Sequence, residues 1–192
     1  DRSMASITSL PSGVSGSSLV LLETQTASSS STISFTSNID STYKEYQFHF
    51  IDIHPSADAE FTFQADTGTN TNYNQTITST AFQAYHYEND GAAELGYNTN
   101  KDLAQSTSFQ RIGTLNSEND DACNGILQIF DPSNTTFVKH FISVINSSAV
   151  TPATYNDFVA GYFNTTTAIT RFQFKMSTGN IDSGTFKLYG VV

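Results

Sequence analysis

Apolar side chains recur at every second position along this chain, and that period constrains its fold more than any other feature. Tyr46, Phe48 and Phe50 alternate with polar residues, and Phe172, Phe174 and Met176 repeat the pattern. In a β-strand successive side chains point to opposite faces, so one face can pack on a core while the other contacts water. The pattern predicts strands from about residue 19 to the end.

The candidate strands follow one another at the spacing typical of a sandwich or barrel. They are Leu19–Thr26, Thr32–Phe35, Tyr43–Ile53, Glu60–Ala65, Gln75–Ala84, Ser106–Ile112, Gly125–Phe130, Thr136–Ile145, Asp157–Phe163, Ile169–Met176 and Thr185–Val191. Between them lie polar runs, including the expected turns Ala27–Ser31, Asp131–Asn134 and Ser177–Asn180 and the loops Asp66–Asn74 and Glu88–Lys101. Only Gly91–Gly96 and Lys101–Gln105 leave room for a short helical turn.

Strands that follow one another without helical crossovers form antiparallel sheets. We therefore predict an all-β fold, an antiparallel two-sheet β-sandwich of jelly-roll-like topology with about ten or eleven strands. A chain of 192 residues fits one such domain. We expect a single β-sandwich domain over residues 19–192 and an extended N-terminal arm over residues 1–18, which are rich in Ser and Gly.

The charge balance disfavours two classes of partner. The chain has 18 acidic residues against 8 Lys and Arg, for a net charge of −10 at pH 7. Nucleic-acid binding needs cations that displace phosphate counterions, and anionic membranes attract basic surfaces. We expect no nucleic-acid partner and no membrane insertion, because no run approaches the ~18 apolar residues of a membrane span. The N-terminus also lacks the pattern of a secretory signal.

The sequence carries no catalytic signature. It has no G-x-S-x-G elbow, P-loop, H-E-x-x-H or C-x-x-C motif. The single Cys123 cannot form an intrachain disulfide, and the neighbouring Asp120 and Asp121 should oppose thiolate formation. We predict that the protein is not an enzyme, with no catalytic residues and no cofactor.

Histidines and clustered acids are the candidate metal ligands. The histidines are His49, His54, His86 and His140, and none pairs with another at helical metal-site spacing. The acids cluster as Glu118, Asp120 and Asp121, and as Glu88 and Asp90. Carboxylates of this kind can bind Ca²⁺, but their spacing departs from the calcium-loop pattern. We therefore predict packed or surface histidines, solvated acidic loops and no metal site.

Aromatic residues near expected loop tips offer one binding possibility. Tyr85 and Tyr87 flank His86, and Tyr97 and Tyr155 lie near other strand ends. Such rings either stack on a sugar or close the end of the sandwich. A carbohydrate-binding module is one alternative, although the absence of Trp counts against it.

Six phrases that occur in order resemble a domain of virion structural proteins of tailed bacteriophages. They are TQTASSS (Thr24–Ser30), FTSNIDSTY (Phe35–Tyr43), DLAQSTSF (Asp102–Phe109), FVKHF (Phe137–Phe141), GYFNTT (Gly161–Thr166) and GTFKLYG (Gly184–Gly190). The resemblance runs from about residue 19 to the end. It carries no catalytic motif, so it implies a particle component without site residues.

The resemblance suggests a non-enzymatic capsid decoration or cement protein on the virion exterior, made in the host cytoplasm. Its partners would be the major capsid protein and itself, as a homotrimer in which subunit contacts cover exposed edge strands. The alternative is a tail-fibre, head-fibre or baseplate module that binds the host surface, including its glycans.

Overall fold

The computed structural model describes residues 18–149 and 152–192, which form twelve strands and no helix. The strands are β1 (Leu19–Ser30), β2 (Ile33–Phe35), β3 (Glu45–Pro55), β4 (Ala59–Thr67), β5 (Ile77–Tyr87), β6 (Ala93–Tyr97), β7 (Gln110–Leu115), β8 (Cys123–Phe130), β9 (Lys139–Ala149), β10 (Ala153–Phe163), β11 (Ile169–Met176) and β12 (Ile181–Val191). The predicted arm over residues 1–18 lies outside the described residues except for Ser18. In the described ranges no helix is long and apolar enough to cross a membrane.

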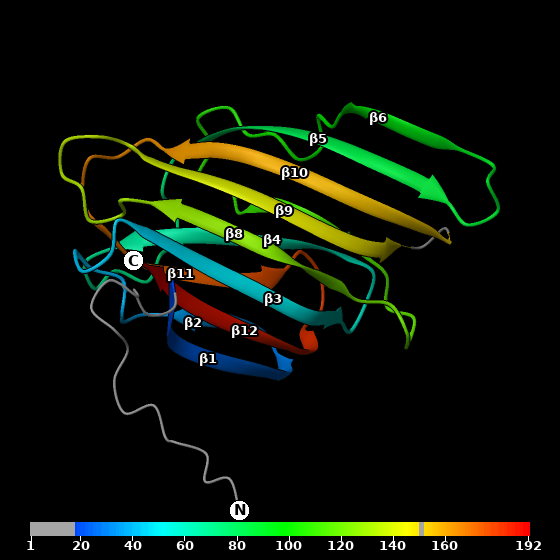
Figure 1. The fold of residues 1–192 in the computed structure, drawn as a ribbon, viewed down its shortest axis with the longest axis horizontal. Helices are drawn as coiled ribbons and strands as arrows, with labels where there is room; N and C mark the ends of the chain where they lie inside the picture. The colour runs from blue at the N-terminus through cyan, green and yellow to red at the C-terminus, as the bar shows by residue number, and fades with distance from the viewer. Residues whose placement is uncertain (1–17, 150–151) are drawn as a thin grey trace, which may run out of the picture.

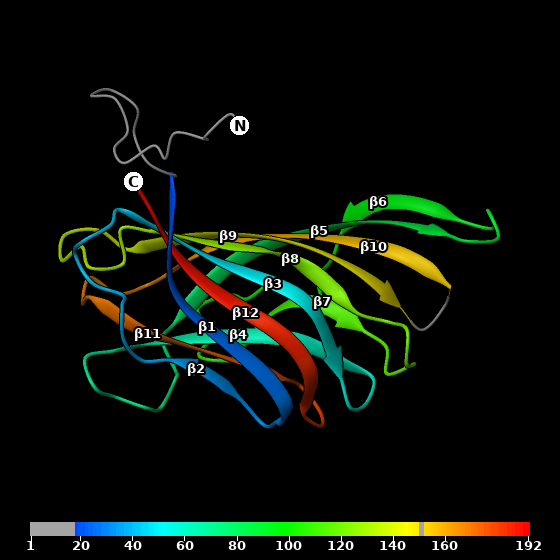
Figure 2. The same ribbon diagram turned by 60° about the horizontal axis from the view of Figure 1, so that its bottom comes forward.

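The strands form two sheets, and every neighbouring pair is antiparallel. The larger sheet has the order β1-β12-β3-β8-β9-β10-β5-β6, and the smaller has the order β2-β11-β4-β7 (Figure 1). The smaller sheet packs beneath one part of the larger, while β6 projects beyond it (Figure 2). The prediction of an all-β, antiparallel two-sheet sandwich is confirmed.

The alternating apolar residues form the core between the sheets. Tyr46, Phe48 and Phe50 on β3 are buried and face the buried Phe172 and Phe174 on β11. The Phe48 and Phe174 rings lie 5.0 Å apart with an edge-to-face tilt, an arrangement that aromatic quadrupoles favour. Ten of the 15 phenylalanines are fully buried, so stacked and edge-on rings fill most of the space between the layers.

One expected turn is strand instead. The predicted turn Ala27–Ser31 mostly belongs to β1, because Ala27 is buried and pairs with Gly184 on β12. Gly184 has φ +128°, and a Cβ atom there would lie 2.8 Å from the carbonyl oxygen of Asp52. The pairing of β12 with β3 shifts register at this point, and the backbone there needs a glycine.

The segment Gly91–Gly96 is not a helical turn, and this expectation was wrong. It belongs largely to β6, which pairs with β5 through Phe82 opposite Tyr97. Because β6 is an edge strand exposed along most of its length, its residues show no buried alternation. Lys101–Gln105 is an irregular, non-helical segment.

Strands β5 and β6 widen the larger sheet beyond the smaller one, whereas β9 and one end of β10 still pack on it, where Phe141 and Phe163 contact Phe63 on β4. The inner face of β5 is covered there by a loop, residues 98–109, that runs beneath it. The amide of Asn98 donates to the Ala81 carbonyl, and Ser79 and Leu103 exchange backbone and side-chain hydrogen bonds. This arrangement puts polar groups where a sandwich usually has apolar ones, and the candidate site lies at this point.

The Phe174→Ala variant tests whether the aromatic core stabilises the sandwich. Phe174 contacts six other phenylalanine rings, so its removal leaves a large cavity and should lower the free energy of unfolding by about 3–5 kcal/mol. Urea unfolding followed by circular dichroism measures the change. The control Phe137→Ala removes a ring that is 68% exposed and should change stability by less than about 0.5 kcal/mol. Equal losses in both variants would contradict this account of the core.

Candidate functional site

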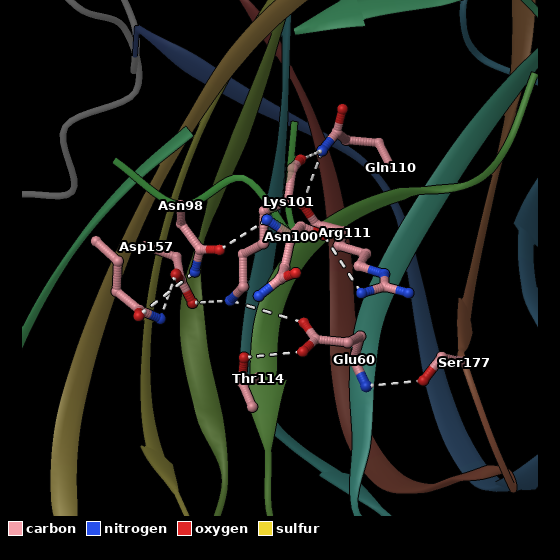
Figure 3. A network of polar contacts seen from close by, with 10 residues as sticks. Glu60, Asn98, Asn100, Lys101, Gln110, Arg111, Thr114, Asp157 and Ser177 are labelled. Carbon is pink, nitrogen blue, oxygen red and sulfur yellow. Dashed lines mark hydrogen bonds and ion pairs between the residues drawn. The ribbon is translucent and has the colours of Figure 1, made fainter. Parts of the chain in front are cut away.

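An ion pair is buried where the 98–109 loop meets the widened sheet. Lys101 and Asp157 are 2% and 1% exposed, and Lys101 Nζ lies 2.5 Å from Asp157 Oδ2 (Figure 3). Gln83 Nε2 donates to the other oxygen, Asp157 Oδ1, at 2.8 Å. Glu60 Oε2 lies 3.7 Å from Lys101 Nζ, so one ammonium group faces two carboxylates.

Neighbouring side chains hold this network in place. Gln110 is fully buried, and its Nε2 donates to the Lys101 carbonyl at 2.6 Å. Thr114 donates to Glu60 Oε1 at 3.1 Å. Because Lys101 and Asp157 are closed to solvent, the network ties the loop to the sheet and offers no open surface to a substrate.

Cys123 lies close enough to this network for the charges of Asp157 and Lys101 to affect the pKa of its thiol. The thiol is fully buried, and burial raises its pKa well above the ordinary value, with the negative charge of Asp157 adding to the shift. The sequence suggested that Asp120 and Asp121 would oppose thiolate formation, but burial and Asp157 are responsible. A thiol in this state is a poor nucleophile.

Three tyrosines form a platform on the inner face of the widened sheet. The Tyr85 ring centre lies 5.4 Å from that of Tyr87 and 5.5 Å from that of Tyr155, with interplanar angles of 33° and 30°. The Tyr85 hydroxyl donates to Glu94 Oε2 at 3.0 Å, and this hydrogen bond raises the pKa of Tyr85. Burial, reinforced by Tyr87, raises the pKa of Tyr155. The Tyr85 and Tyr155 hydroxyls therefore stay protonated at neutral pH, and because Tyr85 already donates to Glu94, its oxygen can only accept from a further group.

Shallow recesses border the platform on two sides. One of 220 Å³ is lined by Gln83, Tyr85, Glu94, Asn98 and Asn100, among others. Another of 380 Å³ is lined by Tyr87, Glu88, Asn89 and Pro152. Flat aromatic rings beside amide and carboxylate groups form a surface suited to the apolar faces and hydroxyl groups of sugars.

Tyr97 is not part of this platform, although the sequence grouped it with the other tyrosines. It pairs with Phe82 across β5 and β6, and its hydroxyl donates to Asp102 at 2.8 Å. Paired residues in an antiparallel sheet share a face, so the register places Tyr97 with Phe82 and away from Tyr85, although at this sheet edge Tyr97 also borders the 220 Å³ recess.

A separate hollow of 470 Å³ lies on the other side of the 98–109 loop. Asn100, Phe109, Arg111 and Lys175 are among the residues that line it. Lys175 Nζ lies 4.0 Å from the centre of the Phe109 ring, and Arg111 donates to the Asn100 carbonyl. Both basic groups are therefore engaged in stabilising the loop.

The four histidines lie apart from one another. His49 packs 4.6 Å from Tyr189 and burial lowers its pKa, whereas His54 contacts the Asp121 carbonyl at 2.7 Å. His86 pairs with Asp90 at 3.1 Å, and His140 lies 5.9 Å from the Tyr162 ring. Each of the four contacts a different partner, and none of these contacts joins two histidines.

The clustered acids share a hollow without converging on one point. Glu88, Glu118, Asp120 and Asp121 are among the residues that line a depression of 270 Å³. Within residues 18–149 and 152–192, no group of three His, Cys, Asp or Glu side chains is placed to hold a metal ion.

Comparisons with known proteins leave this site to be interpreted from its own geometry. No family model, curated protein or solved structure matches the chain.

Replacement of Lys101 by methionine tests the buried ion pair. The variant leaves the Asp157 carboxylate buried without its cation, which should lower the free energy of unfolding by about 3–5 kcal/mol. The control is Lys44→Met, which breaks the exposed pair with Asp131 and should cost less than about 1 kcal/mol. Chemical denaturation of both variants measures the difference.

A double variant separates the lost charge pair from simple misfolding. In Lys101→Met with Asp157→Leu the fully buried carboxylate is removed and only the more exposed Glu60 loses its cation, so part of the lost stability should return. A Lys101→Met variant no less stable than Lys44→Met would show that the pair does not hold the loop to the sheet.

Proposed function

We propose that this protein is a non-enzymatic structural component of a bacteriophage particle, a capsid decoration or cement protein that acts as a homo-oligomer on the head shell. The proposal rests on the ordered phrases that resemble virion structural domains and on the way the strands are wrapped. Its mechanism is mechanical, because contacts with the major capsid protein and with further copies would hold neighbouring capsomers together.

The strand order is the observation that carries this proposal. Eight strands form the two sets β1-β12-β3-β8 and β2-β11-β4-β7, in which strands from the two halves of the chain alternate. We interpret this wrap as a jelly roll, with β5-β6 and β9-β10 added to one edge of one sheet. Jelly rolls are common in viral capsid and lectin domains, both of which work by binding.

The N-terminal end of β1 lies at one edge of the larger sheet, which supports different contacts at the β1 and β6 edges of the domain. Leu19 pairs with Val191 at the β1 edge of the larger sheet, and β6 forms the opposite edge. A preceding segment anchored on the major capsid protein would leave the β5-β6 side available for other contacts.

Labelling of intact phage particles tests the proposed location. Antibodies raised against this chain and viewed by electron microscopy should decorate the head surface of the phage that encodes it. Labelling confined to the tail would favour the alternative, a fibre or baseplate module, and would overturn the decoration role. Absence of label from permeabilised and intact particles alike would overturn both.

The tyrosine platform favours a second candidate function, recognition of a glycan. Two tilted pairs of tyrosine rings and the neighbouring Glu94 and Gln83 offer stacking and hydrogen bonds on one face of the sheet. A decoration or fibre protein with such a site would attach the particle weakly to a saccharide-coated surface.

A glycan array probed with the purified full chain tests this candidate. The Tyr85→Ala and Tyr155→Ala variants should each weaken binding of any retained saccharide by about tenfold, because each removes a stacking ring. Tyr189→Ala is the control, since Tyr189 lies on β12 and contacts His49, away from the platform. Binding that survives both platform variants, or no retained saccharide, would exclude the platform as a glycan site.

A further inference from the structure

The outer face of the widened sheet carries no charged strand residue. Strands β8, β9, β10, β5 and β6 contain two acids, Glu94 and Asp157, and both point to the inner face, where they contact Tyr85 and Lys101. The one Lys in these strands, Lys139, is buried and donates to the carbonyls of Phe137 and Thr165. A chain of net charge −10 therefore places its charge elsewhere.

Apolar side chains form a continuous row across this uncharged face. The register aligns Ile126, Val144, Phe158, Phe82 and Tyr97 on five consecutive strands. The Phe82 and Phe158 rings stack 4.6 Å apart at an angle of 8°, and Phe82 remains 46% exposed. Beside this row lie Ile142, 43% exposed, and Leu95, 69% exposed.

A neighbouring row supplies polar groups that are complementary to themselves. Asn124, Asn146 and Asn156 lie side by side on β8, β9 and β10. Within the chain Asn146 Nδ2 donates to Thr154 Oγ1 and to the Tyr155 carbonyl, and Asn124 Oδ1 accepts from the Asp52 amide. The Asn146 oxygen and the Asn124 amino group are a complementary acceptor and donor for the same row on another copy, which a row of carboxylates could not supply.

We infer that this face, made of the outer sides of β8, β9, β10, β5 and β6, packs against a second copy of the chain. Two molecules of the same strongly negative charge repel one another least where their strands present no charged side chain, and on this face the carboxylates of Asp90, beside His86, and Asp102, beside Tyr97, come from loops at the β5-β6 margin. A cationic partner would instead be drawn to the acidic remainder of the surface. The inference rests on the homo-oligomer of the proposed function and names the surface that forms it.

The size of the face is adequate for a stable contact. Five strands with ~4.8 Å spacing and ~3.3 Å per residue present roughly 600 Å² in projection. A standard interface buries ~800 Å² per partner, so side-chain relief and the rim would complete it. The apolar row is one part of this area and polar side chains such as Asn146 make up the rest, and contiguous exposed apolar residues are typical of interaction surfaces.

Sedimentation velocity over a range of concentrations tests the interface with the protein as it exists. The wild-type chain should sediment as an oligomer, and Phe82→Thr should weaken association by about tenfold or more, because it removes a ring near the centre of the face. Leu21→Thr is the matched control. It removes a side chain that is 51% exposed on β1, at the far edge of the same sheet, and should leave association unchanged.

Two further readouts separate the possible outcomes. Circular dichroism melts show whether Phe82→Thr remains folded, and higher salt should strengthen association by screening the like charges. A wild-type oligomer that Phe82→Thr does not weaken would overturn this surface but keep the homo-oligomer. A wild-type monomer at all concentrations would overturn both, while particle labelling would still decide the virion role.

Discussion

The structure depends on a mismatch between its two layers. Eight strands form one sheet and four form the other, so phenylalanine rings from the smaller sheet can cover only part of the larger one. The uncovered inner face of β10, β5 and β6 is closed by a loop, and a loop brings backbone polar groups that need partners. Buried polar side chains supply them. Gln64 donates to the carbonyls of Gln75, Thr107 and Ser108, and the Lys101–Asp157 pair fixes the loop from its other side.

Because the larger sheet is wider than the smaller one, parts of both faces of β10 and β5 remain accessible. On the inner face the loop over residues 98–109 covers the strands as far as Asp157. Beyond it β10 and β5 continue to Tyr155 and Tyr85, which remain accessible beside Glu94. On the outer face the alternate residues Phe158 and Phe82 stack in the open. Strand alternation therefore separates a polar, tyrosine-rich surface from an apolar, uncharged one by a single sheet's thickness.

The sequence predicted the sandwich because its signal is local. Phe172, Phe174 and Met176 reveal a strand without knowledge of any neighbour, and β11 has the predicted bounds. Strand β6 was missed because an exposed edge strand forms through backbone pairing with β5 and needs no apolar alternation. The Ser-rich end of β1 was missed for a related reason, since its one core residue, Ala27, is small.

The candidate site was only partly predictable. Tyr85, Tyr87 and Tyr155 were recognised as possible platforms, but the registers that bring Tyr85 opposite Tyr155 and exclude Tyr97 join distant segments. Asp157 carried a usable signal, because it shares the inward parity of Val159 and Phe163 in a predicted strand. An acid at an inward position requires a cation, yet nothing local identifies Lys101, which comes from a loop 56 residues away.

Phe82 and Phe158 show what a local pattern can reveal about an interface. Each sits beside an apolar residue of the opposite parity, Ala81 and Val159, so these strands are apolar on both faces over a short stretch. A strand of a two-layer sandwich needs one apolar face for its core. Among residues 18–149 and 152–192 nothing buries this second apolar face, since Phe82 stays 46% exposed, and its outward strand positions hold no acid. Selection for solubility alone would place charge at these sites, as it does elsewhere on this acidic molecule. The absence of acidic side chains from these outward strand positions is the reason to regard the face as a contact surface rather than as incidental exposure of two aromatic rings.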